Sequence, residues 1–197
     1  MRAKITGAGM YVPERCVPNE ELLERFECSE EWIIQRSGIR TRHWVTTETP
    51  ADLAESASRA ALERSNRSAS EIDCIILATL SPQAEFPGTS FFLQRQLGLE
   101  DTPCFDLRAQ CSGFIFSLSV AKGFIESGQF ERILVVGCEL QSRGLDMTPE
   151  GRDVAVLFGD GAGAVIVEAS SDKDNESGLL EIRLHAQGKF AEKLWTE

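Results

Sequence analysis

The most informative stretch of the sequence places a cysteine where a short strand is expected to pass into a long apolar helix. Residues 104–107 are predicted as the strand, Cys111 follows, and residues 112–127 are predicted as the helix. A thiol at a helix N-terminus faces unpaired backbone N–H groups and the positive end of the helix dipole, and both favour the thiolate. The same N–H groups could stabilise the oxyanion that forms when a thiolate attacks a carbonyl. Cys111 is therefore a candidate nucleophile, although its position alone also fits a buried structural cysteine.

The other cysteines and the two histidines suggest less chemistry. Cys74 and Cys138 lie within apolar runs, so we interpret both as core residues. A cysteine nucleophile usually needs a histidine, but His43 and His185, the two histidines of the chain, each fit a structural role better. The sequence contains no C-x-x-C pair, so ligand spacing argues against a zinc site.

Strand and helix patterns alternate along the chain, which predicts an α/β layered domain with a largely parallel sheet. The clearest helix spans residues 50–66, where small and aliphatic side chains form one face. Apolar runs typical of strands covered on both faces occur at residues 72–79 and 132–138. The remaining predicted elements are strands at residues 4–9, 104–107, 154–158, 162–168 and 179–185, and helices at residues 18–26 (capped by Asn19), 29–38, 88–97 and 112–127. Residues 170–177 are polar and are predicted as a surface loop.

Composition and charge exclude several classes of protein. The 197 residues are 42% hydrophobic and 26% charged, which is typical of a globular domain, and the net charge of −11 argues against a nucleic-acid binder. No apolar run approaches the ~18 residues of a membrane-spanning helix, and the N-terminus has no apolar signal-peptide stretch. The glycine-rich residues 159–163 lack the Lys and Ser/Thr of a phosphate-binding loop. We therefore expect a cytoplasmic protein that contacts neither membrane nor nucleic acid.

Several motifs occur in the order found in one enzyme family. They are residues 7–13 followed by Asn19, residues 31–33 and 36–40, the pairs Ala78-Thr79, Phe86-Pro87 and Phe105-Asp106, residues 109–114 and residues 157–164. With these motifs the sequence resembles the β-ketoacyl-acyl-carrier-protein synthase III family of the thiolase-like superfamily. The family's fold has two similar halves, stacked as α-β-α-β-α. The resemblance implies that residues 1–197 form an N-terminal thiolase-like half with a mixed sheet, and that a C-terminal half is absent from this chain.

The resemblance also implies a two-stage acyltransferase reaction of fatty-acid or related biosynthesis that uses no cofactor. An acyl-CoA primer would acylate Cys111, and malonyl-acyl-carrier protein would then lose CO2 and attack the thioester to give a 3-oxoacyl product. The family completes this site with a His and an Asn from its second half. We therefore expect this chain to need a C-terminal half for condensation, since His185 lies in a stretch similar to a late strand of the family.

Binding positions for coenzyme A and for a second subunit follow from the same resemblance. Trp32 and Arg152 are similar to the pair that holds the adenine, and Arg36 is similar to a residue that contacts a phosphate. An indole and a guanidinium suit a nucleobase because both are flat. Phe86 is similar to a residue that crosses the homodimer interface into the partner's acyl pocket. The family's subunits would pair through the strand after the nucleophile helix, here residues 132–138.

Alternative functions stay open at this point. A thiolase or a type III polyketide synthase would carry a cysteine at the same helix start. A non-catalytic or incomplete subunit is a second alternative, against which the presence of Cys111 counts. A cysteine hydrolase is a third, because residues 110–113 loosely resemble peptidase nucleophile motifs. The carrier protein is itself acidic, so docking would need a local basic patch, for which Arg36, Arg40 and Arg42 are candidates.

Overall fold

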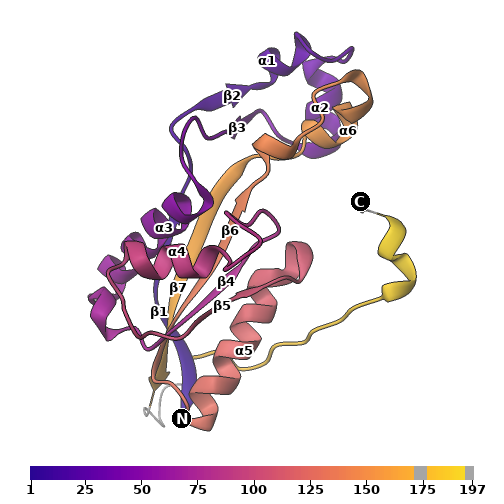
Figure 1. The fold of residues 1–197 in the computed structure, drawn as a ribbon. Coiled ribbons are helices and arrows are strands. Elements are labelled where there is room, and N and C mark those ends of the chain that lie inside the picture. Colours follow the sequence, from indigo (N-terminus) through magenta and orange to yellow (C-terminus); the bar gives the residue numbers. More distant parts are fainter. Residues whose placement is uncertain (171–176, 194–197) are drawn as a thin grey trace.

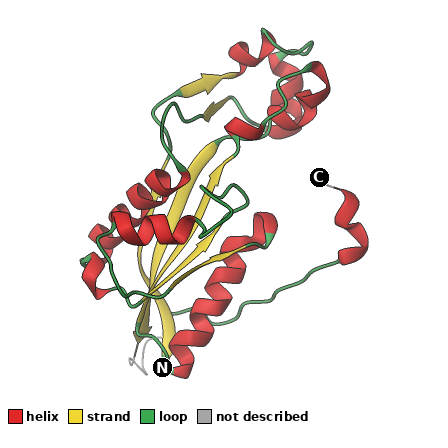
Figure 2. Cartoon of the chain, viewed as in Figure 1, coloured by secondary structure: helices red, strands yellow, loops and turns green. Residues whose placement is uncertain are grey.

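The centre of the protein is one five-stranded sheet (Figures 1 and 2). The computed structural model describes residues 1–170 and 177–193. The strands follow the order β1-β7-β6-β4-β5 across the sheet. Their bounds are Arg2–Tyr11 (β1), Cys74–Ala78 (β4), Cys104–Leu107 (β5), Arg132–Leu140 (β6) and Asp160–Ser170 (β7). The strands predicted at residues 4–9, 72–79, 104–107, 132–138 and 162–168 are therefore confirmed.

The sheet is mixed, with parallel pairs on one side and antiparallel pairs on the other. β4 pairs in parallel with both β5 and β6, and the helices α4 (Thr89–Gln96) and α5 (Gly113–Ser127) connect these strands. β7 pairs antiparallel with both β6 and β1. The prediction of a largely parallel sheet is wrong, because the chain between β6 and β7 forms only short helical turns and returns the strand in the opposite direction. The mixed sheet that the family resemblance implied is confirmed.

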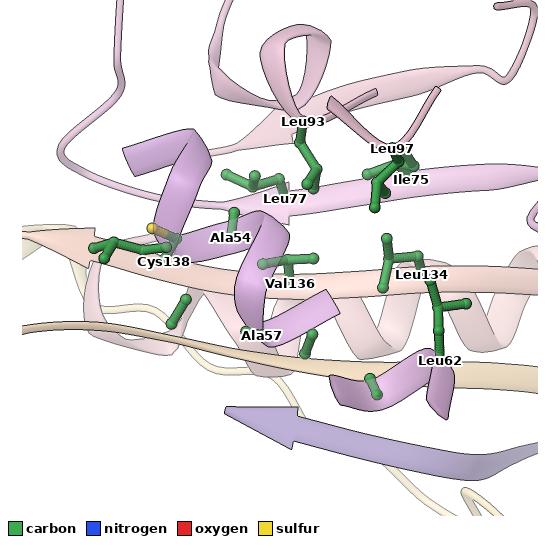
Figure 3. Close-up of a cluster of buried hydrophobic side chains, with 14 of the residues drawn as sticks. Ala54, Ala57, Leu62, Ile75, Leu77, Leu93, Leu97, Leu134, Val136 and Cys138 are labelled. Carbon is green, nitrogen blue, oxygen red and sulfur yellow. The ribbon is translucent and has the colours of Figure 1, made fainter. Parts of the chain in front are cut away.

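Helices cover both faces of the sheet and create two hydrophobic cores. On one face α3 (Pro50–Ser65) and α4 pack over Leu77 and Val136, and Figure 3 shows these side chains pointing into the same cluster. On the other face α5 packs over Ile76 and Val135. Successive residues of a strand point to opposite faces, so β4 and β6 supply apolar side chains to both cores. This arrangement explains why both strands are apolar along most of their length.

A smaller unit, which we call the cap lobe, extends beyond one end of the sheet (Figure 1). It contains the antiparallel strands β2 (Cys16–Pro18) and β3 (Thr41–His43) and the helices α1 (Asn19–Leu23), α2 (Glu30–Ser37) and α6 (Arg152–Ala155). Phe26, Ile33 and Trp44 are buried in its separate core. Two segments that lie more than 100 residues apart in the sequence thus build the lobe, which is why no local pattern predicted β2 and β3.

Two buried charged side chains hold the cap lobe in place. Arg42 donates to Asn19 Oδ1 at 2.6 Å and to two backbone carbonyls, and its burial lowers the pKa of its guanidinium. Asp160, at the start of β7, accepts from the N–H groups of Val45 and Ser142, each at 2.8 Å. Hydrogen bonds to buried charges are among the stronger ones in proteins, so they specify where the lobe sits. Arg42 is therefore a structural residue and is not available to dock an acidic carrier.

Two local predictions around the cap lobe are wrong. Residues 154–158 form part of α6 and a turn instead of a strand. Short apolar runs fit a strand and a buried helical turn equally well, and here Ala155 and Val156 pack into the cap-lobe core. Asn19 does not cap α1, because Pro18 occupies the N-cap position. The Asn19 side chain instead donates to the carbonyl of Ile39 at 2.8 Å.

The C-terminal segment leaves the sheet and runs past α5 (Figure 1). Residues 179–185 were predicted as a strand, but they form none: the N–H of Leu179 donates to the carbonyl of Ala3, and no ladder follows. A short helical turn, Gly188–Lys193, ends the described chain. Most of the loop predicted at residues 170–177 lies outside the described residues. Within the described part of the chain, no helix is long and apolar enough to cross a membrane.

Candidate active site

Cys111 lies in a single helical turn between β5 and α5. The turn is Gln110–Ser112, and α5 begins directly after it at Gly113. Gln110 has a φ of 47°, a left-handed conformation that is uncommon for a residue with a side chain. This sharp change of direction leaves Cys111 exposed. The predicted position of Cys111 at the entry to the helix is therefore confirmed, with the difference that it precedes the first α-helical residue.

A cavity of about 280 Å³ opens beside Cys111. Its wall comes from the ends of β4, β6 and β7 and from the start of α5, and its lining residues are Ala78, Gln110, Cys111, Gly113, Phe114, Gly137, Cys138, Glu139, Gly161, Ala162 and Gly163. Glycines on the paired strands β6 and β7 leave this space open. Gly137 lies opposite Gly163, and Gly161 lies opposite Glu139. A methyl group on Gly163 would meet nothing within 4 Å, whereas one on Gly137 would lie 3.3 Å from the Phe114 ring.

Cys138 lines the same cavity, but its sulfur has a different environment. Cys138 is buried, and its Sγ donates to the carbonyl of Pro50 at 3.2 Å. Burial raises the pKa of the Cys138 thiol and raises that of Cys74 to about 12. Both sulfurs therefore stay protonated at neutral pH, and only a thiolate is a good nucleophile. The interpretation of Cys74 and Cys138 as core residues is confirmed.

Neither histidine lines the cavity. His43 lies on β3 in the cap lobe, where its Nδ1 is hydrogen-bonded to the carbonyl of Pro13. His185 is exposed in the C-terminal segment. The residues around the cavity thus supply the thiols of Cys111 and Cys138 and the carboxylate of Glu139, but no imidazole. Among residues 1–170 and 177–193, no group of three or more His, Cys, Asp and Glu could hold a metal ion.

The three residues expected to bind coenzyme A lie together in the cap lobe. The guanidinium carbons of Arg36 and Arg152 lie 4.4 Å and 4.6 Å from the centroid of the Trp32 ring. α2 positions Trp32 and Arg36, and its first turn is capped by Ser29, whose Oγ accepts from the N–H of Trp32 at 3.1 Å. α6 begins with Arg152, which also donates to the carbonyl of Glu27 at 3.3 Å. A base could enter between Trp32 and Arg152 only if the two side chains separate.

Phe86 lies in the loop between β4 and α4 and is 91% exposed. The strand named above for subunit pairing, residues 132–138, cannot pair with another subunit because β6 already has β4 and β7 on its two sides. That prediction is wrong. The edges of the described sheet are β1 and β5, and β5 leads directly to Cys111.

The comparisons with known proteins agree with the motifs. A family model of 3-oxoacyl-[acyl-carrier-protein] synthase III matches residues 105–188. A β-ketoacyl-[acyl-carrier-protein] synthase III from Ehrlichia canis is 42% identical over 196 residues, which are 99% of this chain and 60% of that protein. The chain is thus a relative of the β-ketoacyl-acyl-carrier-protein synthase III family. It spans about three fifths of the length of the curated relatives that it matches.

Solved structures of β-ketoacyl-acyl-carrier-protein synthase III share this fold. The enzyme from Aquifex aeolicus superposes with a TM-score of 0.84 at 44% identity, covering 87% of this chain and 55% of that one. A priming β-ketosynthase from the R1128 polyketide pathway superposes with a TM-score of 0.81 at 37% identity, covering 86% of this chain and 50% of that one. The predicted thiolase-like fold and the family resemblance are therefore confirmed.

Sequence reasoning missed two features of the site. Glu139 follows the apolar run of residues 132–138 but lies within β6, and its place on the cavity wall depends on the pairing of β6 with β7. The left-handed conformation of Gln110 had no signal, because the residue type is not typical of it. Gly161 and Gly163 were visible in the sequence, and their spacing of two residues could have indicated that one face of this strand carries no side chains there.

Proposed function

We propose that this protein is a condensing acyltransferase that uses Cys111 to accept an acyl group from acyl-CoA. The observation that carries this proposal is the exposed Cys111 thiol beside a cavity at the entry to α5. A thiolate there would attack the thioester carbonyl. The C–S bond to Cys111 forms as the C–S bond to coenzyme A breaks, and the coenzyme leaves as its thiolate, which takes up a proton from solvent in place of the one that Cys111 gave up. Backbone N–H groups at the start of α5 favour both the thiolate and the oxyanion.

In the second stage the acylated protein would react with malonyl-acyl-carrier protein. Loss of CO2 leaves a carbanion on the malonyl carbon, this carbon attacks the Cys111 thioester, and the 3-oxoacyl product leaves as the thiolate of Cys111 re-forms. A neighbouring base or hydrogen-bond donor must stabilise the enolate, and the described cavity offers no histidine for this. We propose that a His and an Asn from a C-terminal half supply it, and that the reaction needs no cofactor.

The cap lobe is the proposed binding site for coenzyme A. Its flat cationic and aromatic surface at Trp32, Arg36 and Arg152 suits an adenine ring and phosphates. The proposal includes a homodimer in which Phe86 enters the partner's acyl pocket. The edge strand β5 supports this, because an unpaired strand edge is a natural site for subunit pairing. Together these features suit a cytoplasmic enzyme of fatty-acid synthesis.

A second candidate is the priming step of polyketide synthesis, supported by the 37% identity to a polyketide priming ketosynthase. Both candidates use the same cysteine chemistry and differ in the primer and in the carrier protein. The test is a condensation assay on the full-length protein with acyl-CoA and malonyl-acyl-carrier protein. We expect a 3-oxoacyl product with the wild type and none with Cys111→Ala, whereas the same yield from Cys111→Ala would contradict the proposal.

A further inference from the structure

Three strands of the sheet carry small residues side by side beneath the Cys111 cavity. Ala78 on β4 lies opposite Gly137 on β6, and Gly137 lies opposite Gly163 on β7. We call these three residues the cavity floor, since all of them line the cavity. Paired residues of neighbouring strands point to the same face of a sheet, and a Cβ on Gly137 would lie 3.3 Å from the Phe114 ring of α5. The floor therefore faces the start of α5, where Cys111 lies.

Open space lies above Gly163, in contrast to Gly137. A Cβ added to Gly163 would meet nothing within 4 Å, although β7 is an interior strand between β1 and β6. The next residue of β7 on this face, Val165, is buried in the core beneath α5. Because side chains on interior strands normally fill the space beside them, this end of the cavity exists because residue 163 has no side chain.

The fold itself does not require a glycine at position 163. The φ of Gly163 lies outside the left-handed region, so a side chain there would cause no backbone strain. Gly9 on the neighbouring strand β1 is different, because a Cβ there would collide with the carbonyl of Ala57 on α3. Backbone conformation and close packing, which explain other glycines of this protein, therefore leave Gly163 unexplained.

Gly163 also marks the side of the cavity that is farthest from the strand leading to Cys111. That strand is β5, and β4, β6 and β7 follow it across the sheet. Neighbouring strands lie about 4.8 Å apart, so Gly163 lies about 10 Å across the sheet from Ala78. Met10 on β1, which pairs with Gly163, does not line the cavity. The floor bears no polar side chain, and an apolar surface of this kind suits a hydrocarbon chain.

We propose that Gly163 determines which acyl groups Cys111 accepts, because the space above it holds the far end of a longer acyl chain. The inference rests on the proposed function, since it concerns the acyl group of that reaction. A side chain at position 163 would point into the cavity, take up this space and leave room for short acyl groups alone. A difference of one or a few carbons in an apolar pocket commonly changes relative rates about tenfold or more.

The experiment compares Gly163→Ala and Gly163→Val with the wild type in the full-length protein. Alanine adds one methyl group, and valine adds more volume with a β-branched side chain that suits a strand. Gly123→Val is the matched control, because Gly123 is exposed on α5 and does not line the cavity. Two ratios are measured: Cys111 acylation by hexanoyl-CoA relative to acetyl-CoA, and Cys111 alkylation by N-hexyl iodoacetamide relative to iodoacetamide. Urea unfolding verifies that each variant is folded.

We expect Gly163→Val to lower both ratios about tenfold or more, Gly163→Ala to lower them less, and Gly123→Val to leave them unchanged. Unchanged ratios in Gly163→Val, an equal loss with both acyl groups, or a wild type that takes acetyl but not hexanoyl groups would overturn the role of Gly163. Failure of both Gly163 variants to fold would overturn it too, because the fold would then need the glycine. A wild type that takes neither acyl group contradicts the proposed function instead, and the alkylation ratio then still decides whether residue 163 limits the cavity.

Discussion

Cys111 and Cys138 line one cavity, but Cys111 is exposed while the Cys138 sulfur is buried and donates to the carbonyl of Pro50. Their difference follows from the elements that carry them. Cys138 belongs to a central strand covered by α3, and Cys111 belongs to a turn with a left-handed residue before it. The same residue type therefore serves packing in one place and is free for chemistry in the other.

Buried thiols predict that stability falls at alkaline pH. An unfolded thiol has a pKa of about 8.5, whereas burial raises the pKa of folded Cys74 to about 12 and also raises that of Cys138. Below pH 8.5 both states keep the proton, and above it the unfolded state loses the proton first, so the free energy of unfolding decreases as pH rises. Urea unfolding between pH 7.5 and 10 under reducing conditions measures this. Cys74→Ala should show a shallower decline than the wild type, and parallel curves would contradict the assignment.

Adding a methyl group to Gly88, the N-cap residue of α4, should lower the stability of the fold. Its φ is +106°, and a Cβ there would lie 1.7 Å from Asp106 Oδ2. Asp106 is needed in place, since its Oδ1 accepts from the N–H of Ser90 at 2.9 Å. Gly88→Ala should therefore lower the free energy of unfolding by about 2 kcal/mol or more.

Gly123 provides a control in which the same substitution should stabilise the protein. It is an exposed residue of α5, and a Cβ added there would meet nothing within 4 Å. Gly123→Ala should raise the free energy of unfolding by about 0.5–1 kcal/mol. Urea denaturation measures both variants. Equal effects of the two substitutions would show that the contact with Asp106 is not the cause.

The sequence predicted most of the sheet because its central strands are long apolar runs with helices between them. The helix at residues 50–66 was also recognisable: Pro50 begins it, and Thr49 and Asp52 form a capping box. The failures have specific physical causes. β2 and β3 are three residues long and are stabilised by packing with residues more than 100 positions away, such as Phe158, whose carbonyl accepts from Trp44 Nε1. Residues 179–185 have a strand pattern, but a strand forms only beside a partner.

The residues of the candidate site also differ in whether the sequence could predict them. Cys111 could be predicted because the strand and the helix around it are local patterns. The stacking of Arg152 on Trp32 joins residues 120 positions apart in the sequence, so only the family resemblance brought these two together, whereas Arg36 lies one helical turn from Trp32 on α2. Glu139 could not be predicted, because its three donors come from the loop after β4 and from Gln141.

Removing the Trp32 ring should weaken coenzyme A binding. Stacking of a base on an aromatic ring contributes about 1–3 kcal/mol, so Trp32→Ala should raise the dissociation constant about tenfold or more. Calorimetric titration of the full-length protein with coenzyme A measures it. The dissociation constant of Trp32→Phe, which keeps a smaller ring, should lie between those of the wild type and Trp32→Ala. Equal affinity in Trp32→Ala and the wild type would exclude the cap lobe as the adenine site.

The exposed ring of Phe86 predicts a role in dimerisation. Replacing it by Ser removes apolar area that the proposed dimer would bury. The dissociation constant of the dimer should therefore rise about tenfold. Val154→Ser is a matched control, because Val154 is an exposed apolar residue of the cap lobe. Sedimentation velocity over a concentration series measures both variants. A dimer that is weakened only by Val154→Ser would place the interface elsewhere.

Intact-protein mass spectrometry after incubation with acetyl-CoA tests the central claim most directly. The account predicts that the full-length wild type gains the mass of one acetyl group, that peptide mapping finds it on Cys111, and that Cys138→Ala still gains it. Cys111→Ala should gain none. An acetyl group on Cys138 or on no cysteine, in protein shown to be folded, would contradict the assignment of Cys111 as the nucleophile.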